Sequence, residues 1–259
     1  MRLLHLAWRN LCVSIHYVYI LAGASLFCMV LLWTVTSPES FNDYSDAFQV
    51  AFAITCASIL VGLLLSISLI CEDYIMIRRE IKMGLSPILI ITAKTINIII
   101  YCLVISAILI FPYFFNAFNI QDQNLLYLYF GVFFTMLAAA ELGLFVSALW
   151  RNKPQIASLF VSIIMLFQIL FSGFLFDDAK LEIFGITVSI SHYSIRAIGS
   201  GLRFDLLDTG LHRVFEISPG HIRENIGLLA VFFGLSFIGS IVILYYVEIR
   251  GKDTKLRPE

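Results

Sequence analysis

Six long apolar segments constrain the fold of this chain more than any other feature of its sequence. An α-helix rises about 1.5 Å per residue, so roughly 20 apolar residues cross the ~30 Å hydrocarbon core of a bilayer. Apolar runs of at least about this length, bounded by charged or turn-forming residues, cover residues 17–36, 48–71, 88–118, 125–149, 156–176 and 226–249. The sequence therefore predicts an all-α polytopic membrane protein with six transmembrane helices.

The composition supports this class and argues against others. Of the 259 residues, 60% are hydrophobic and only 14% are charged, whereas a soluble domain has about half and about a quarter. The formal net charge of −1 leaves no basic surplus for binding nucleic acid. No low-complexity segment, flexible linker or clear internal repeat divides the chain, so we expect one transmembrane domain over residues 1–259.

The basic residues predict the orientation of the spans. The connections at residues 37–47 and 119–124 contain no Lys or Arg, whereas short cytoplasmic connections are enriched in both. Basic residues lie instead at the chain ends and in the second and fourth connections: Arg2, Arg9, Arg78, Arg79, Lys82, Arg151, Lys153, Arg250, Lys252, Lys255 and Arg257. We expect both termini in the cytoplasm, and a multi-pass chain in the inner or plasma membrane of a bacterial cell.

The N-terminal segment, residues 1–16, has the pattern of a surface helix. Arg2, His5, Arg9 and His16 share one helical face, and apolar residues occupy the rest. This pattern predicts an amphipathic helix that lies in the cytoplasmic interface of the membrane.

Residues 177–225 form the longest connection, and span parity places it outside the cell. Its apolar stretches are interrupted by glycines, which predicts short helices near the outer membrane surface. A re-entrant pair of such helices is one arrangement that fits this pattern. His192, His212 and His221 match no metal-ligand spacing, and the five cysteines show no C-x-x-C pattern. We expect surface or capping roles for these histidines, and neither a metal site nor a disulfide framework.

The connection at residues 72–86 is too polar to enter lipid and too short to form a domain. Helix-forming residues with Ile75, Ile77 and Ile81 among them precede a Gly84-Leu85-Ser86-Pro87 stop, which predicts a short helix. Two interpretations remain open. The segment is either a solvated connection whose charges follow the positive-inside tendency, or a helix that docks into a cytoplasmic partner.

Three short motifs occur in the same order as in one known family. Each motif is also predicted to lie on the side of the membrane that the family pattern requires. They are Arg79-Glu80 with Gly84 and Lys94, then Phe171-Ser172-Gly173-Phe174, then residues 190–198. These resemble the "RE, then G, then K", "FSGF" and "ISP..YA.EAL" stretches in membrane subunits of ABC-2-type ABC transporters, closest to the ABCG-like half-transporter membrane domain. His192 and Arg196 depart from the more common Pro and Glu or Asp of that family.

The resemblance implies a permease that pairs with a second copy or a related permease and is driven by separate ATP-binding subunits. Residues 72–86 would then be the coupling helix, with the partner contacts Arg78, Arg79, Glu80, Lys82, Met83 and Gly84. The chain itself contains no G-x-x-x-x-G-K-[ST] motif, since its only Gly-Lys pair, Gly251-Lys252, is followed by Asp253. We therefore expect no catalytic residue and no cofactor in this chain, with ATP and Mg bound by the partner.

Glu141 is the only acidic residue well inside a predicted span. It lies about 12 Å from the cytoplasmic helix end, at a depth where a carboxylate costs on the order of 2.5–3.5 kcal/mol unless it faces protein or water. Glu141 and Phe145 are therefore candidates for lining a translocation pathway. The alternative is a structural carboxylate, either protonated or held by Lys94, Arg151 or a nearby hydroxyl.

Small residues repeat at helical spacing on two spans. Ser58, Gly62 and Ser66 form one ridge, and Ala139, Gly143 and Ser147 form another. Such ridges allow close approach of helix backbones in membranes, so we expect both to be packing seams.

The leading hypothesis is a permease subunit of an ATP-driven exporter for an amphipathic substrate such as a lipid, glycan, peptide or drug-like molecule. The alternative is an ATP-independent ion- or proton-coupled carrier or channel that uses Glu141, although one intramembrane acid is thin support for it. An intramembrane enzyme would need a motif such as H-E-x-x-H or a Ser/His pair within the spans, and neither occurs.

Overall fold

The computed structural model describes residues 15–35, 44–71, 73–114, 125–172, 189–202 and 219–253. All its regular secondary structure in these ranges is helical, with no β-strand. In chain order the helices are α2 (Ile15–Val35), α3 (Tyr44–Cys71), α4 (Tyr74–Lys82), α5 (Pro87–Phe114), α6 (Leu125–Leu149), α7 (Pro154–Leu170), α9 (Ile190–Gly201) and α11 (Pro219–Asp253). The predicted all-α fold is confirmed, whereas the predicted interfacial helix at residues 1–16 lies almost wholly outside the described residues.

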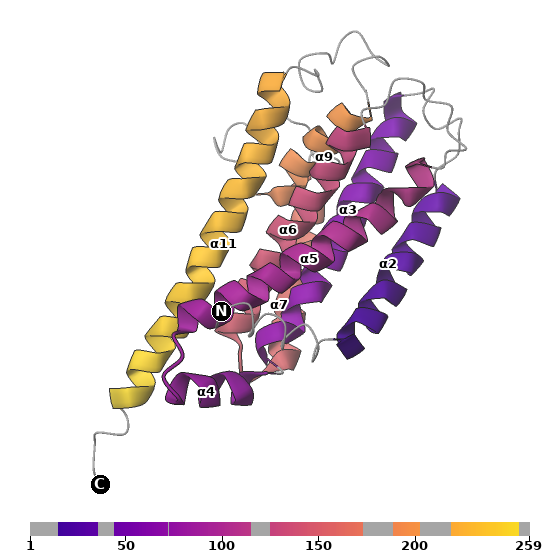
Figure 1. The fold of residues 1–259 in the computed structure, drawn as a ribbon. Helices are drawn as coiled ribbons and strands as arrows, with labels where there is room; N and C mark the ends of the chain where they lie inside the picture. The colour runs from indigo at the N-terminus through magenta and orange to yellow at the C-terminus, as the bar shows by residue number, and fades with distance from the viewer. Residues whose placement is uncertain are drawn as a thin grey trace.

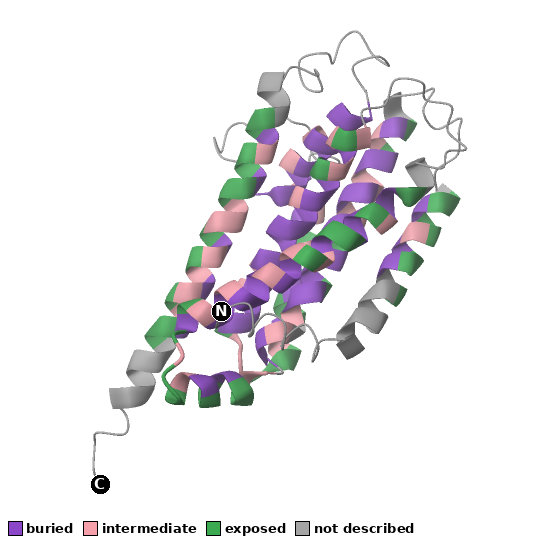
Figure 2. Ribbon diagram, in the orientation of Figure 1, coloured by how far each residue is buried: buried purple, intermediate pink, exposed green. Residues whose placement is uncertain are grey.

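Helix α6 lies at the centre of the bundle. It contacts α3, α5, α7, α9 and α11, and most of its side chains are buried. Helix α2 packs against α3 and α5 on one side of the bundle, and α11 runs along the other (Figure 1). Burial is therefore concentrated in α3, α6 and α9, while the outer faces of α2 and α11 are exposed (Figure 2).

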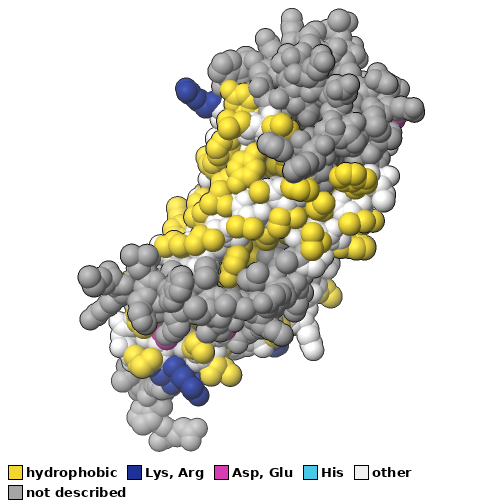
Figure 3. All heavy atoms as spheres, turned by 45° about the vertical axis from the view of Figure 1, so that its right-hand side comes forward, with side chains coloured by type: hydrophobic (Ala, Val, Ile, Leu, Met, Phe, Trp, Pro, Cys, Tyr) yellow, Lys and Arg dark blue, Asp and Glu magenta, His cyan; other side chains and the backbone are white. Residues whose placement is uncertain are grey.

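The exposed surface of the bundle is apolar over its middle. Figure 3 shows hydrophobic side chains across this region, with Lys and Arg side chains near the two ends. The exposed apolar residues include Phe27 and Trp33 on α2, Leu166 on α7, and Leu235 and Val242 on α11. A lipid environment makes such a surface favourable, which agrees with a polytopic membrane protein.

The six predicted spans each fall on a helix. Four described helices, α3, α5, α6 and α11, are long and apolar enough to cross a membrane. Within the described residues, α2 and α7 carry the shorter apolar stretches Ser25–Thr34 and Pro154–Leu170. The polytopic membrane fold is thus confirmed, and the total of six crossings stays a prediction.

Helix ends differ from the predicted span ends where polar residues continue a helix. Helix α11 begins at Pro219 and reaches Asp253, beyond both ends of the predicted span at residues 226–249. A hydropathy pattern locates the apolar stretch of a helix, whereas the helix itself continues until its backbone hydrogen bonding is interrupted. Proline suits the first helical turn because it has no N–H to leave unpaired, and this explains the starts of α5, α7 and α11.

Helix α9 lies wholly within the predicted external loop, and it packs into the bundle. All its residues except Tyr193 and Arg196 are buried, against α6, α11, α3 and α7. At the start of α9, the Ser189 hydroxyl and the Ser191 amide donate hydrogen bonds to the Oε1 of Gln168 on α7, at 3.0 Å and 3.1 Å. His192, expected at the surface or in a capping role, is buried with these residues, because α9 is covered on several sides. His212 lies outside the described residues, and His221 lies in α11.

Candidate functional site

Helix α4 lies across one end of the bundle, between the ends of α3 and α5 (Figure 1). Its apolar residues occur on two different faces. Ile77 is buried and packs with the core, whereas Ile75 is 69% exposed and Met83, just after the helix, is 75% exposed. Arg78, Arg79 and Lys82 are exposed with them. The outer face of α4 therefore combines apolar and basic side chains.

Glu80 does not share this exposed face. It is 5% exposed, because it follows Ile77 by three residues and so lies on the side of α4 that faces the bundle. Of the six residues predicted to contact a partner, the structure exposes Arg78, Arg79, Lys82, Met83 and Gly84 and buries Glu80, while the contacts themselves stay a prediction.

A tight turn joins α4 to α5. The Met83 amide donates to the carbonyls of Arg79 and Glu80, and the next residue, Gly84, has a φ of +91°. This backbone conformation favours glycine because a Cβ would be strained there. The Ser86 hydroxyl then accepts a 3.4 Å hydrogen bond from the Leu89 amide, and Pro87 begins α5. The turn thus connects α4 directly to the start of α5.

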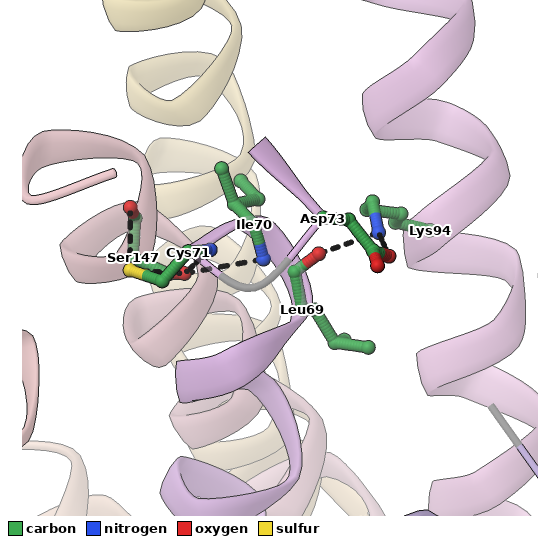
Figure 4. Close-up of polar contacts among 6 residues, drawn as sticks. All are labelled: Leu69, Ile70, Cys71, Asp73, Lys94 and Ser147. Atoms are coloured by element: carbon green, nitrogen blue, oxygen red, sulfur yellow. Dashed lines mark hydrogen bonds and ion pairs between the residues drawn. The ribbon is translucent and has the colours of Figure 1, made fainter. Parts of the chain in front are cut away.

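A buried lysine on α5 links back to the other end of α4. Lys94 is 4% exposed, and its Nζ donates to the Asp73 carboxylate at 2.8 Å and to the Leu69 carbonyl at 2.5 Å (Figure 4). Asp73 directly precedes α4, and its own carbonyl accepts the Ile77 amide in the first turn of that helix (2.9 Å). Lys94 therefore holds both the last turn of α3 and the entry to α4.

The end of α3 is also held by α6. The Ser147 hydroxyl accepts hydrogen bonds from the amides of Ile70 (3.3 Å) and Cys71 (3.2 Å), and the Cys71 thiol lies 3.4 Å from the Ser147 carbonyl (Figure 4). Just beyond α6, the Arg151 guanidinium lies over the ring of Tyr74, 5.3 Å from its centroid. The ends of α3 and α6 and Lys94 of α5 thus meet where α4 begins.

The sequence alone did not identify this junction. Asp73 and Ser147 were not predicted to act together, and the role of the Leu69 carbonyl has no sequence signal. The sequence offers Lys94 as part of a motif and as a partner for Glu141, but nothing in it pairs Lys94 with Asp73, although a lysine two turns into an apolar helix indicates a buried partner.

The family profile described as ABC-2 type transporter matches residues 2–202, which includes every helix from α2 to α9. This chain belongs to the ABC-2 type transporter family. A comparison with curated proteins gave no match. The predicted family is confirmed, and with it the assignment of this multi-pass membrane chain as a transporter permease component. The ABC-2 match covers α4 and the junction at its start.

In this ABC-2 family member Glu141 is enclosed within a single chain. Its exposed fraction is 0%, and neither carboxylate oxygen has a hydrogen-bond partner among the described residues. Thr95 and Cys102 of α5 are its neighbours. Lys94, one of the expected partners, pairs with Asp73 instead, and Arg151 lies against Tyr74. Phe145 lies against α11, where its ring would meet a Cβ added at Gly239.

The two small-residue ridges meet at the contact between α3 and α6. A Cβ added at Gly62 would lie 2.5 Å from the Met136 carbonyl oxygen and 3.1 Å from the Ala139 Cβ. A Cβ added at Gly143 would meet the Ser66 hydroxyl and lie 3.1 Å from the Leu63 carbonyl oxygen. Ser58 is buried, and its hydroxyl donates to the Ile54 carbonyl of its own helix at 2.7 Å. Glycine at positions 62 and 143 thus allows the two backbones to approach closely.

The described residues contain no group of three or more His, Cys, Asp or Glu side chains that could hold a metal ion. The candidate site thus consists of the exposed face of α4 and the polar junction behind it.

Proposed function

We propose that this chain is the permease subunit of an ATP-driven ABC exporter. Two permeases, either two copies or one copy and a related chain, form a pathway for an amphipathic substrate. Separate subunits bind ATP and Mg and dock on α4, which places α4 and both chain termini on the cytoplasmic side. The observation that carries this proposal is the exposed apolar and basic face of α4, in a chain of the ABC-2 family.

The exposed face of α4 suits a protein partner better than water or lipid. Exposed Ile75, Met76 and Met83 present apolar side chains on a helix that also carries Arg78 and Arg79. Amphipathic helices with apolar anchors dock into grooves, and their charges select a partner of opposite potential. The ATP-binding subunit should therefore present an apolar groove with an acidic rim.

The pathway is better placed between permeases than around Glu141. The Glu141 side chain is fully buried inside one chain, and Phe145 packs near α11. In contrast, α2, α7 and α11 keep apolar faces that are free to meet lipid or a second permease. A pathway along such a contact suits a substrate with both polar and apolar parts.

The experiment that tests this function is purification of the full chain from its native host in mild detergent, followed by native mass spectrometry. We expect a P-loop ATPase subunit in stoichiometric amount and two permeases in the complex. A chain that purifies without an ATPase subunit, and still transports or conducts after reconstitution, would contradict the proposal and support the ATP-independent alternative.

Charge reversal on α4 should separate the two subunits. We expect the double variant Arg79→Glu/Met83→Asp to lose the ATPase subunit, because it places acidic groups opposite an acidic rim and removes an apolar anchor. The loss of a central anchor costs on the order of 2 kcal/mol, or roughly 30-fold in affinity. The measurement is the ratio of ATPase subunit to permease after affinity purification.

The matched control is Asn152→Asp/Lys153→Glu, which changes the charge equally in the exposed connection between α6 and α7. This control should keep the ATPase subunit. Equal loss from both double variants would show a general charge effect and would contradict a specific role for α4.

A further inference from the structure

The geometry points to Lys94 as the positioning residue that makes α4 and α5 move as one unit. This inference rests on the proposed function, because it concerns how a displacement of α4 by the ATP-binding subunits reaches the membrane helices. Its structural basis is the ion pair and hydrogen bond that Lys94 makes at the start of α4 (Figure 4).

Lys94 closes a loop between α4 and α5. At its C-terminal end α4 is joined to α5 through residues 83–86, and at its N-terminal end Asp73 is joined to α5 through Lys94. Lys94 lies seven residues after Pro87, about 10 Å along α5. Two attachments that far apart prevent α4 from pivoting on the turn at Gly84.

The link between Lys94 and Asp73 is costly to break. Lys94 is almost fully buried, so an ammonium group that left Asp73 and the Leu69 carbonyl would remain desolvated without a partner. Removing one partner of a buried ion pair is strongly destabilising for this reason. The contact should therefore persist while α4 is displaced.

Lys94 also contacts α3 through the Leu69 carbonyl. Leu69 lies in the last turn of α3, and the next two amides of that turn are bound by Ser147 of α6. A displacement of α4 thus acts on α5 through both attachments, and on the end of α3 through the short chain connection after Cys71 as well as through the hydrogen bond from Lys94 to Leu69. Without Lys94, residues 83–86 would be the remaining attachment of α4 to α5, and their positive-φ glycine could absorb the movement.

The test uses a fluorine probe on α5, far from the junction. Trifluoromethyl-phenylalanine replaces Phe111, which is exposed and lies about 25 Å beyond Lys94 along the helix. The purified complex with its ATPase subunit, in lipid nanodiscs, is examined by fluorine NMR before and after trapping with Mg-ATP and vanadate. In the otherwise unchanged complex we expect trapping to shift the probe signal.

The decisive variant is Lys94→Met/Asp73→Leu, which removes both charges together and so leaves no unpaired buried ion. We expect this variant to fold and to retain its ATPase subunit, but to lose the probe shift on trapping. Lys94→Arg keeps a cation in reach of Asp73 and should retain the shift, as should the control Lys153→Met in the exposed connection after α6. If the double variant is not recovered from membranes, Lys94→Met alone replaces it, because it leaves only the partly exposed Asp73 without a partner, and it should also lose the shift.

The inference is overturned if the double variant, or Lys94→Met in its place, keeps the full shift while its ATPase subunit is bound. It is also overturned if trapping does not shift the probe in the unmodified complex. Failure of the proposed function is a different result, because no ATPase subunit would then purify with the unmodified permease.

Discussion

Replacing Gly62 with leucine should abolish accumulation of folded protein in the membrane. The Cβ alone would lie 2.5 Å from the Met136 carbonyl oxygen and 3.3 Å from the Ala140 amide nitrogen, and neither backbone atom can move without displacing α6. Overpacking at such a site costs about 3 kcal/mol or more. The measurement is the monodisperse fraction and melting temperature of the detergent-solubilised chain.

The matched control for Gly62→Leu is Gly234→Leu on α11. Gly234 also lies within an apolar helix, but a Cβ added there meets no atom within 4 Å. The control should accumulate as the unmodified chain does. Similar behaviour of the two variants would contradict the close contact between α3 and α6.

Replacing Glu141 with lysine should likewise prevent folding, whereas glutamine should be tolerated. Glu141 is fully buried about 12 Å from the end of α6, too deep for a lysine to reach water, and its neighbours Thr95 and Cys102 offer no compensating negative charge. An uncompensated buried charge costs about 3–5 kcal/mol. Glutamine keeps the size of the side chain and carries no charge. The measurement is again the yield of folded chain, compared between the two variants.

The same pair of variants bears on the alternative function. If Glu141 is a structural group, the Gln variant should keep ATP-driven activity in the assembled complex. A Gln variant that folds and assembles but loses all transport would show that the carboxyl group exchanges a proton or ion during transport. Normal accumulation of the Lys variant would show that water reaches this position, contrary to its burial.

The helices were predictable because their signals are local. An apolar run of sufficient length forms a helix in lipid with all its backbone bonds satisfied, so the ranges for α3, α5, α6 and the centre of α11 follow from composition and spacing. The small-residue ridges on α3 and α6 could be read in the same way, since residues four apart share a face whatever the rest of the chain does. The extra turns of α11 were missed because polar residues continue a helix without any hydropathy signal.

The details of the site depended on contacts between distant residues. The family motif that implies partner contacts for Arg79 and Glu80 does not say which side of the helix each occupies, and the orientation of α4 against the bundle exposes Arg79 and buries Glu80. Lys94 was weighed as a partner for Glu141, whereas the end of α3 brings Asp73 within 2.8 Å of it. Burial of α9 was also beyond sequence reasoning, because its cover comes from helices on both sides of it in the chain.

Photo-crosslinking from α4 tests whether α4 is the docking site of a separate ATP-binding subunit. Benzoyl-phenylalanine would be placed at Met83 on the exposed face, at Ile77 on the buried face, and at Asn152 in the exposed connection between α6 and α7. After irradiation of cells, we predict a crosslink from position 83 to a P-loop ATPase, and none from positions 77 and 152. No ATPase crosslink from position 83, or an equally strong one from position 152, would show that α4 is not the specific docking site.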